Sequence, residues 1–90
     1  MATVCKRVLY SGRVQGVGFR YTAQGLAAGY AVAGSVRNLL SGEVELVAEG
    51  EDDVVEAFLA AVAHRMADYI TNTTVRDAAL SGQRGFRIRH

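Results

Sequence analysis

The stretch Val4–Arg20 reads VCKRVLYSGRVQGVGFR, and it carries the strongest structural signals in the chain. Its first part, Val4 to Tyr10, is rich in β-branched and aromatic residues, which favours a strand. Glycines then punctuate Ser11 to Gly18, which indicates a loop. Beyond the loop, apolar and small residues recur at helical spacing, so we expect a helix over about Phe19 to Ala28, ending on Gly29 as a left-handed cap. A strand, a loop and a helix are therefore predicted in succession.

The next segment has the pattern of a hairpin. Val32 to Leu39 and Glu43 to Glu49 flank the short turn Leu40-Ser41-Gly42. In the second run apolar residues alternate with polar ones, which predicts one buried face and places Glu45 on the opposite, polar face. Gly50 breaks the alternation, so we expect the strand to end before it.

A second helix and two further strands complete the pattern. Glu51-Asp52-Asp53 place negative charge in a first helical turn, where the helix dipole favours it. Thr71 to Leu80 and the short Phe86 to Arg89 are expected to be strands. Five apolar residues at helical spacing predict the core-facing stripe of the second helix: Val55, Phe58, Leu59, Val62 and Met66.

The order of these elements predicts the fold class. A β-α-β-β-α-β succession with a short extra strand favours an α+β, ferredoxin-like split βαβ sandwich, with an antiparallel sheet that carries both helices on one face. Ninety residues are expected to form one domain over residues 1–90. The single cysteine, Cys5, cannot form an internal disulfide, and we interpret it as a small strand residue.

Composition limits the partners. Ten Lys and Arg residues against nine Asp and Glu give a formal net charge of +1. This balance excludes the bulk electrostatics of a dedicated duplex-DNA binder and leaves a local basic patch open. No apolar stretch approaches the ~20 residues of a membrane span, and Met1 to Arg7 has no apolar targeting core. We therefore expect a cytoplasmic protein without a membrane partner, and a monomer by default.

The glycine-rich loop is the candidate site. Gly12 to Arg20 joins a strand to a helix, where successive backbone N–H groups and the helix dipole can converge on an anion. No Gly-Lys-Ser/Thr follows, as a Walker A loop requires, and Tyr21 stands where a dinucleotide fingerprint has its third glycine. The pattern predicts a small oxyanion cradle, and a loop that serves only as a tight turn is the alternative.

Two side chains sharpen this interpretation. A cation such as Arg20 in a first helical turn works against the dipole unless an anion binds there, although an arginine extended into solvent is also common. Asn38 ends the second predicted strand, which the split βαβ topology places parallel to the first, with the third strand between them. Arg20 and Asn38 should then lie at one edge of the sheet, with roughly 10 Å between their backbones, a gap that two long polar side chains can bridge. Taken alone, Asn38 is more often a turn former.

These motifs resemble the acylphosphatase family. The resemblance rests on Ser11 to Arg20, on Val36-Arg37-Asn38-Leu39 eighteen residues later, and on Gly42-Glu43-Val44-Glu45 and Ala48-Glu49-Gly50. It implies hydrolysis of the mixed anhydride of a carboxylic and phosphoric acid. It also implies that Arg20 binds the phosphate and Asn38 orients the water. The amide cradle then comprises Gln15, Gly16, Val17, Gly18 and Phe19.

The chain departs from the family pattern at two places. Ser35 stands where relatives frequently have Trp, which should alter packing beside the site and leave the chemistry unchanged. Ala63 to Tyr69 replaces a common Gly-Pro turn, so the alignment of Asp68 to Val75 stays open.

The implied chemistry needs few functional groups. No carboxylate pair or Cys/His cluster flanks the loop, and the leaving carboxylate of an acyl phosphate is already a weak base. We therefore expect no metal and no cofactor, with an acyl phosphate as substrate and no nucleic acid as partner. A non-catalytic small-anion or RNA-binding module is the alternative, since Arg84-Gly85-Phe86 faintly echoes an RNA-recognition signature. A second alternative is a domain of a larger carbamoyl-phosphate-handling enzyme. The lack of attached domains in this sequence argues against it.

Overall fold

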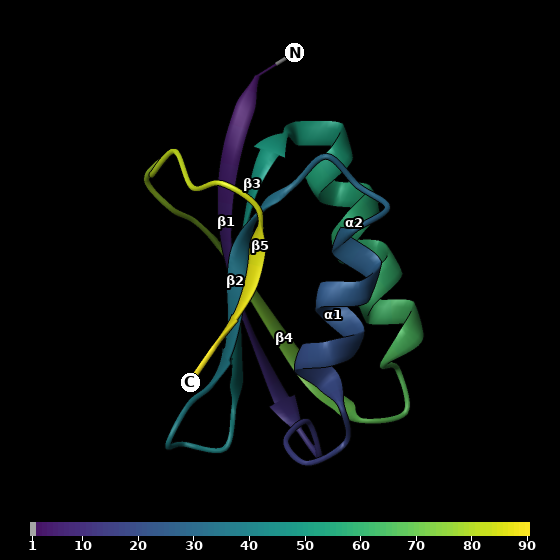
Figure 1. Ribbon diagram of the computed structural model, residues 1–90. Helices are drawn as coiled ribbons and strands as arrows, with labels where there is room; N and C mark the ends of the chain where they lie inside the picture. Colours follow the sequence, from purple (N-terminus) through teal and green to yellow (C-terminus); the bar gives the residue numbers. More distant parts are fainter. Residues whose placement is uncertain (1) are drawn as a thin grey trace.

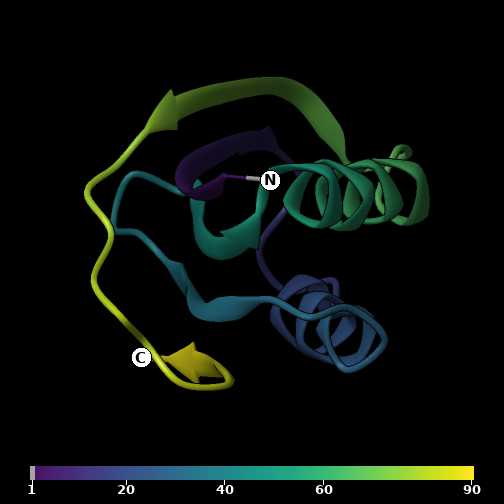
Figure 2. The ribbon, with the colours of Figure 1, turned by 90° about the horizontal axis from the view of Figure 1, so that it is seen from above.

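The computed structural model describes residues 2–90, which form one five-stranded sheet and two helices (Figure 1). The sheet order is β4-β1-β3-β2-β5, and all neighbouring strands are antiparallel except β2 and β5. Both helices cover one face of the sheet, as the view from above shows (Figure 2). The elements are β1 (Thr3–Gly12), α1 (Phe19–Ala27), β2 (Ala33–Asn38), β3 (Val44–Glu51), α2 (Asp52–Arg65), β4 (Ile70–Asp77) and β5 (Phe86–Arg89).

This arrangement confirms the predicted ferredoxin-like α+β class. β3 lies between β1 and β2, so the ends of β1 and β2 point the same way. The extra strand β5 pairs with β2 in parallel and forms one edge of the sheet, and β4 forms the other. Neither helix of the described residues is long and apolar enough to cross a membrane.

The core lies between the sheet and the helices. The rings of Tyr10 and Phe19 pack with their centroids 4.9 Å apart, and those of Phe58 and Phe86 lie 5.4 Å apart. Tyr10 and Phe86 therefore face the helices and offer no stacking platform on the opposite face of the sheet. The predicted stripe of α2 packs into this core, with Val55, Phe58, Val62 and Met66 buried and Leu59 partly buried.

Three expectations about how elements end are wrong, the first of them the left-handed cap at Gly29. α1 ends at Ala27 in a tight turn, in which the Gly29 N–H donates to the Leu26 carbonyl at 3.0 Å, and Gly29 is not left-handed. β3 continues through Gly50, which pairs with Val4 of β1. The backbone of the α1–β2 connection packs against Gly50, where a Cβ would lie 2.8 Å from the Ala31 carbonyl oxygen. Glycine is thus required by close packing and does not end the strand.

The third wrong end belongs to β4, which stops at Asp77 and does not reach Leu80. Beyond it the chain leaves the sheet edge, and the Ala78 N–H donates to the Cys5 carbonyl at 2.9 Å. The carboxylate of Glu49 then accepts hydrogen bonds from the backbone N–H groups of Ser81 and Gly82 at 2.9 and 3.0 Å. The segment 78–85 therefore forms a strap from β4 to β5, held in part by a side chain of β3.

The polar face of β3 also differs from expectation, because Glu45 is buried at 6% exposure. β3 is the central strand, so both neighbouring strands supply side chains that cover this face. Arg7 on β1 and Arg37 on β2 both form ion pairs with the Glu45 carboxylate. The alternating sequence pattern predicts that Glu45 faces solvent, whereas in the structure its carboxylate is enclosed by Arg7 and Arg37.

Candidate active site

The loop between β1 and α1 bends at two left-handed glycines. Gly16 has φ 78° and Gly18 has φ 79°, and a Cβ at either position would meet no neighbouring atom. A side chain there would be strained by the backbone conformation alone. Gly18 is the N-cap residue of α1, so the second bend directly precedes the first helical turn. Backbone N–H groups at such a junction are free to bind an anion.

A cavity of about 210 Å³ opens at this junction. We call it the loop cavity. Its lining residues are Val14, Gly16, Gly18, Phe19, Arg20, Tyr21 and Asn38. Arg20 and Asn38, which are far apart in sequence, thus line one cavity, as the topology argument expects. Of the loop residues chosen from the sequence, Gly16, Gly18 and Phe19 also line it, whereas Gln15 and Val17 do not.

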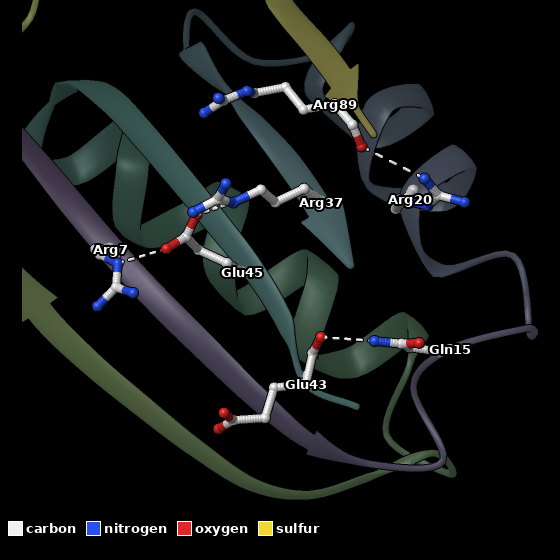
Figure 3. A network of polar contacts seen from close by, with 7 residues as sticks. All are labelled: Arg7, Gln15, Arg20, Arg37, Glu43, Glu45 and Arg89. Atoms are coloured by element: carbon white, nitrogen blue, oxygen red, sulfur yellow. Dashed lines mark hydrogen bonds and ion pairs between the residues drawn. The ribbon is translucent and has the colours of Figure 1, made fainter. Parts of the chain in front are cut away.

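Gln15 and Val17 instead hold the loop in place. The Gln15 side-chain amide donates a hydrogen bond to the carbonyl oxygen of Leu39 at 2.8 Å and another to that of Glu43 at 2.9 Å, the second of which is drawn in Figure 3. These acceptors flank the β2–β3 turn directly after Asn38, so the bonds connect the two halves of the cavity. Val17 is partly buried and packs against the core.

Arg20 has no acidic partner among the described residues. Its Nη1 donates to the carbonyl oxygen of Arg89 at 3.4 Å (Figure 3). The same nitrogen lies 3.2 Å from Nδ1 of His90. The first turn of α1 contains no acidic residue. The positive charge of Arg20 and the positive end of the helix dipole therefore reinforce one another at the cavity. Sequence reasoning did not anticipate the contact with the end of β5, which depends on the parallel pairing of β5 with β2.

Two lining residues were missed at the sequence level. Val14 is fully buried and belongs to the core cluster, so it contributes apolar surface to the cavity. Tyr21 is 73% exposed, and it follows Arg20 at the mouth. An exposed aromatic residue directly after the candidate arginine was the available signal. Among residues 2–90, no three His, Cys, Asp or Glu side chains gather as a metal ion would require.

Comparison with known proteins identifies the family. The family profile described as acylphosphatase matches residues 6–88. An acylphosphatase from Methanospirillum hungatei JF-1 is 42% identical over 88 residues, which cover 93% of this chain and 97% of the relative. The chain belongs to the acylphosphatase family. The resemblance inferred from the loop and from Asn38 is thereby confirmed, and the protein is an enzyme of the hydrolase class.

Solved acylphosphatase structures have the same fold. The crystal structure of acylphosphatase from Bacillus subtilis superimposes with a TM-score of 0.87 and 34% identity, covering 97% of this chain and 99% of that one. Full-length HypF in its phosphate- and nucleotide-bound form superimposes with a TM-score of 0.86 and 27% identity, covering 99% of this chain but only 12% of HypF. The acylphosphatase fold therefore also occurs within a much longer protein.

Proposed function

We propose that this acylphosphatase hydrolyses the carboxyl-phosphate anhydride of acyl phosphates to a carboxylate and inorganic phosphate. The observation that carries the proposal is the loop cavity itself, on which the helix N-terminus, Arg20 and Asn38 converge. One cationic side chain, the backbone N–H groups of a helix N-terminus and one neutral amide side chain match a substrate that is anionic and has a good leaving group.

The phosphoryl group would be held by the loop and Arg20. Its oxygens accept hydrogen bonds from backbone N–H groups around Gly16, Gly18 and Phe19, where the helix dipole adds positive potential. The Arg20 guanidinium donates charge-assisted hydrogen bonds to the same group, since its contacts are the Arg89 carbonyl oxygen and the His90 ring and include no carboxylate of the described residues. Binding therefore turns an unfavourable pairing of cation and dipole into a favourable one.

The attacking water would be oriented by Asn38. The amide oxygen accepts a hydrogen bond from the water, and the amide N–H can donate to a phosphoryl oxygen. The water oxygen forms a bond to phosphorus in line with the breaking bond between phosphorus and the carboxyl oxygen, which departs with its electron pair. The water proton passes to a phosphoryl oxygen of the substrate. The carboxylate needs no proton to leave, so positioning and charge stabilisation suffice.

Hydrolysis of benzoyl phosphate tests these roles. Arg20→Ala should raise KM and lower kcat, whereas Asn38→Ala should lower mainly kcat, each by about 10²-fold or more in kcat/KM. Arg65→Ala and Asn72→Ala, at exposed positions on α2 and β4, are matched controls and should keep wild-type rates. Equal activity in all five proteins would contradict the site assignment.

We also propose that the reaction needs no metal. Turnover by enzyme treated with a chelator should equal that of untreated enzyme, because the chemistry assigned to Arg20, the loop and Asn38 includes no Lewis acid. Loss of activity on chelation, with recovery on adding a divalent cation, would contradict this part of the mechanism while leaving the family assignment intact.

A further inference from the structure

The face of the sheet opposite the helices, here called the open face, carries a row of arginines. Cross-strand register places Arg7 on β1 opposite Arg76 on β4, and Arg37 on β2 opposite Arg89 on β5. Arg87 lies two residues before Arg89 and so points to the same side. Five of the ten basic residues thus lie on one face of a protein with a net charge of +1.

Glu45 holds two of these arginines in a defined orientation. Its carboxylate accepts from Nε of Arg7 at 2.6 Å and from Nε of Arg37 at 2.7 Å (Figure 3). Both bonds use Nε, so the terminal nitrogens of the two guanidinium groups have no partner among the described residues. The two arginine side chains are 42% and 38% exposed, whereas that of Glu45 is 7% exposed. Both oxygens of the Glu45 carboxylate thus already accept hydrogen bonds, whereas the terminal N–H groups of Arg7 and Arg37 remain free to donate.

This cluster has more positive charge than its carboxylate can neutralise. One guanidinium balances Glu45, and the second is in excess. Arg76, Arg87 and Arg89 add further charge and form no ion pair among the described residues. Glu43 and Glu49, elsewhere along the β3 segment, are engaged with serines. Repulsion among like charges that are held close together is unfavourable unless an anion is bound. Because the buried Glu45 carboxylate holds the guanidinium groups of Arg7 and Arg37, these groups cannot move apart to relieve the repulsion.

A depression lies beside this cluster, where Arg89 of β5 is the register partner of Arg37. It has a volume of about 350 Å³ and is lined by Ser35, Gln83, Arg87 and Arg89. Ser35 precedes Arg37 by two residues on the same strand face, and its small side chain leaves the space open. The lining supplies two guanidinium groups, an amide and a hydroxyl, all of which can donate hydrogen bonds.

We propose that Arg7, Arg37, Arg87 and Arg89 form a second anion site, for a ligand with two or more linked phosphate groups. Neighbouring strands lie about 4.8 Å apart and alternate residues of one strand about 6.6 Å apart, so a single phosphate reaches one or two guanidinium groups. Linked phosphates span three or four. Guanidinium groups match phosphate oxygens in bidentate geometry. The site lies on the open face and is separate from the loop cavity.

Titration with inorganic pyrophosphate, followed by NMR of backbone amides, tests the site. The Arg20→Ala variant is used throughout, so that the loop cavity contributes little binding. We expect shifts in β2 and β5, with a Kd about tenfold or more below that for monophosphate. Arg37→Gln, Arg87→Gln and Ser35→Trp should each weaken binding by about fivefold or more, and Arg65→Gln on α2 should not. Shifts confined to the loop cavity, or equal affinity in all variants, would overturn the proposal.

Glu45→Gln separates orientation from simple charge. If net charge alone attracted the ligand, removing a carboxylate would tighten pyrophosphate binding. If Glu45 orients Arg7 and Arg37, its loss should weaken binding by severalfold even though the protein becomes more positive. Tighter binding by a variant that retains a cooperative thermal transition would overturn the role assigned to Glu45.

Discussion

The loop cavity and the open face present positive charge by two different means. In the loop cavity the charge is one arginine that has no acidic partner within residues 2–90, added to backbone N–H groups that carry no net charge. On the open face it is a pair of arginines held by a buried carboxylate. In the loop cavity no carboxylate of the described residues offsets the charge of Arg20, whereas on the open face Glu45 offsets one of the two guanidinium charges that it holds. Loss of a loop-cavity group should therefore act mainly on catalysis, whereas loss of Glu45 should act on stability and on the orientation of Arg7 and Arg37.

The largest expected contrast comes from two glycines with the same backbone conformation. Gly18 has φ 79° and Gly82 in the strap has φ 67°, and a Cβ at either position would have no neighbouring atom within 4 Å. Gly18→Ala and Gly82→Ala should each destabilise the fold by about 1–2 kcal/mol through left-handed strain. Only Gly18→Ala should also lower kcat/KM, by about tenfold or more, because it displaces the amides of the cavity. Chemical denaturation and benzoyl phosphate kinetics on both variants give the two quantities.

If Gly82→Ala lost as much activity as Gly18→Ala, the loss of kcat/KM would reflect general destabilisation. The result would then contradict the catalytic role of the loop-cavity amides.

On the open face the matched pair is Glu45 and Glu43. Glu45→Ala should lower the free energy of unfolding by about 1–2 kcal/mol, because two half-exposed arginines lose a buried partner and solvent screens part of the loss. Glu43→Ala removes hydrogen bonds to Ser11 and Ser41 but no ion pair, and should cost about 0.5 kcal/mol or less. Urea denaturation of the two variants measures the difference. Similar losses would show that the ion pairs contribute little.

Smaller changes in the free energy of unfolding are expected for two helix-terminal arginines, and the two changes should have opposite signs. Without phosphate, Arg20→Ala should raise the free energy of unfolding by about 0.3–1 kcal/mol, because a cation leaves the positive end of α1. Arg65→Ala removes a cation from the last turn of α2, where the dipole favours it, and should lower stability by a similar amount. Thermal unfolding in phosphate-free buffer distinguishes the two. A lower melting temperature for Arg20→Ala would contradict the interpretation of its position.

The smallest expected effect is a pH dependence on the open face. Burial raises the pKa of Glu45, but hydrogen bonds and charge from Arg37 and Arg7 outweigh it and hold this pKa below its ordinary value of 4.5. The unfolded chain therefore takes up the proton first as the pH falls. The contribution of Glu45 is present above pH 4.5 and is lost as the pH falls through its folded-state pKa. Denaturation at about pH 7 and about pH 3 should show a smaller acid loss for Glu45→Gln than for wild type. Equal losses would contradict the assignment.

The sequence predicts most of the fold because its signals are local. The alternating apolar residues of β3 and the stripe on α2 specify which faces are buried, and the glycine loop marks the strand-to-helix junction. The meeting of Arg20 and Asn38 follows from topology alone, once β3 is placed between β1 and β2. The loop cavity could therefore be predicted in outline without coordinates.

The remaining features depend on contacts between distant segments. Gly50 resembles a strand end until the α1–β2 connection is seen packed against it. Alternation alone leaves Glu45 in solvent, because nothing local indicates that arginines on two neighbouring strands will enclose it. The bonds of Gln15 across the cavity likewise need the position of the β2–β3 turn. Each of these features depends on which distant segments pack together, and the residues next to it in the sequence do not indicate that.

The central claim is that a water held by Asn38 attacks phosphorus while the phosphoryl group is bound by Arg20 and the loop. Hydrolysis of benzoyl phosphate in ¹⁸O-labelled water tests it most directly, with the two products analysed by mass spectrometry. The mechanism places the label in inorganic phosphate and leaves benzoate unlabelled. Label in benzoate would mean that water attacks the carbonyl carbon, and would contradict the roles assigned to the loop cavity.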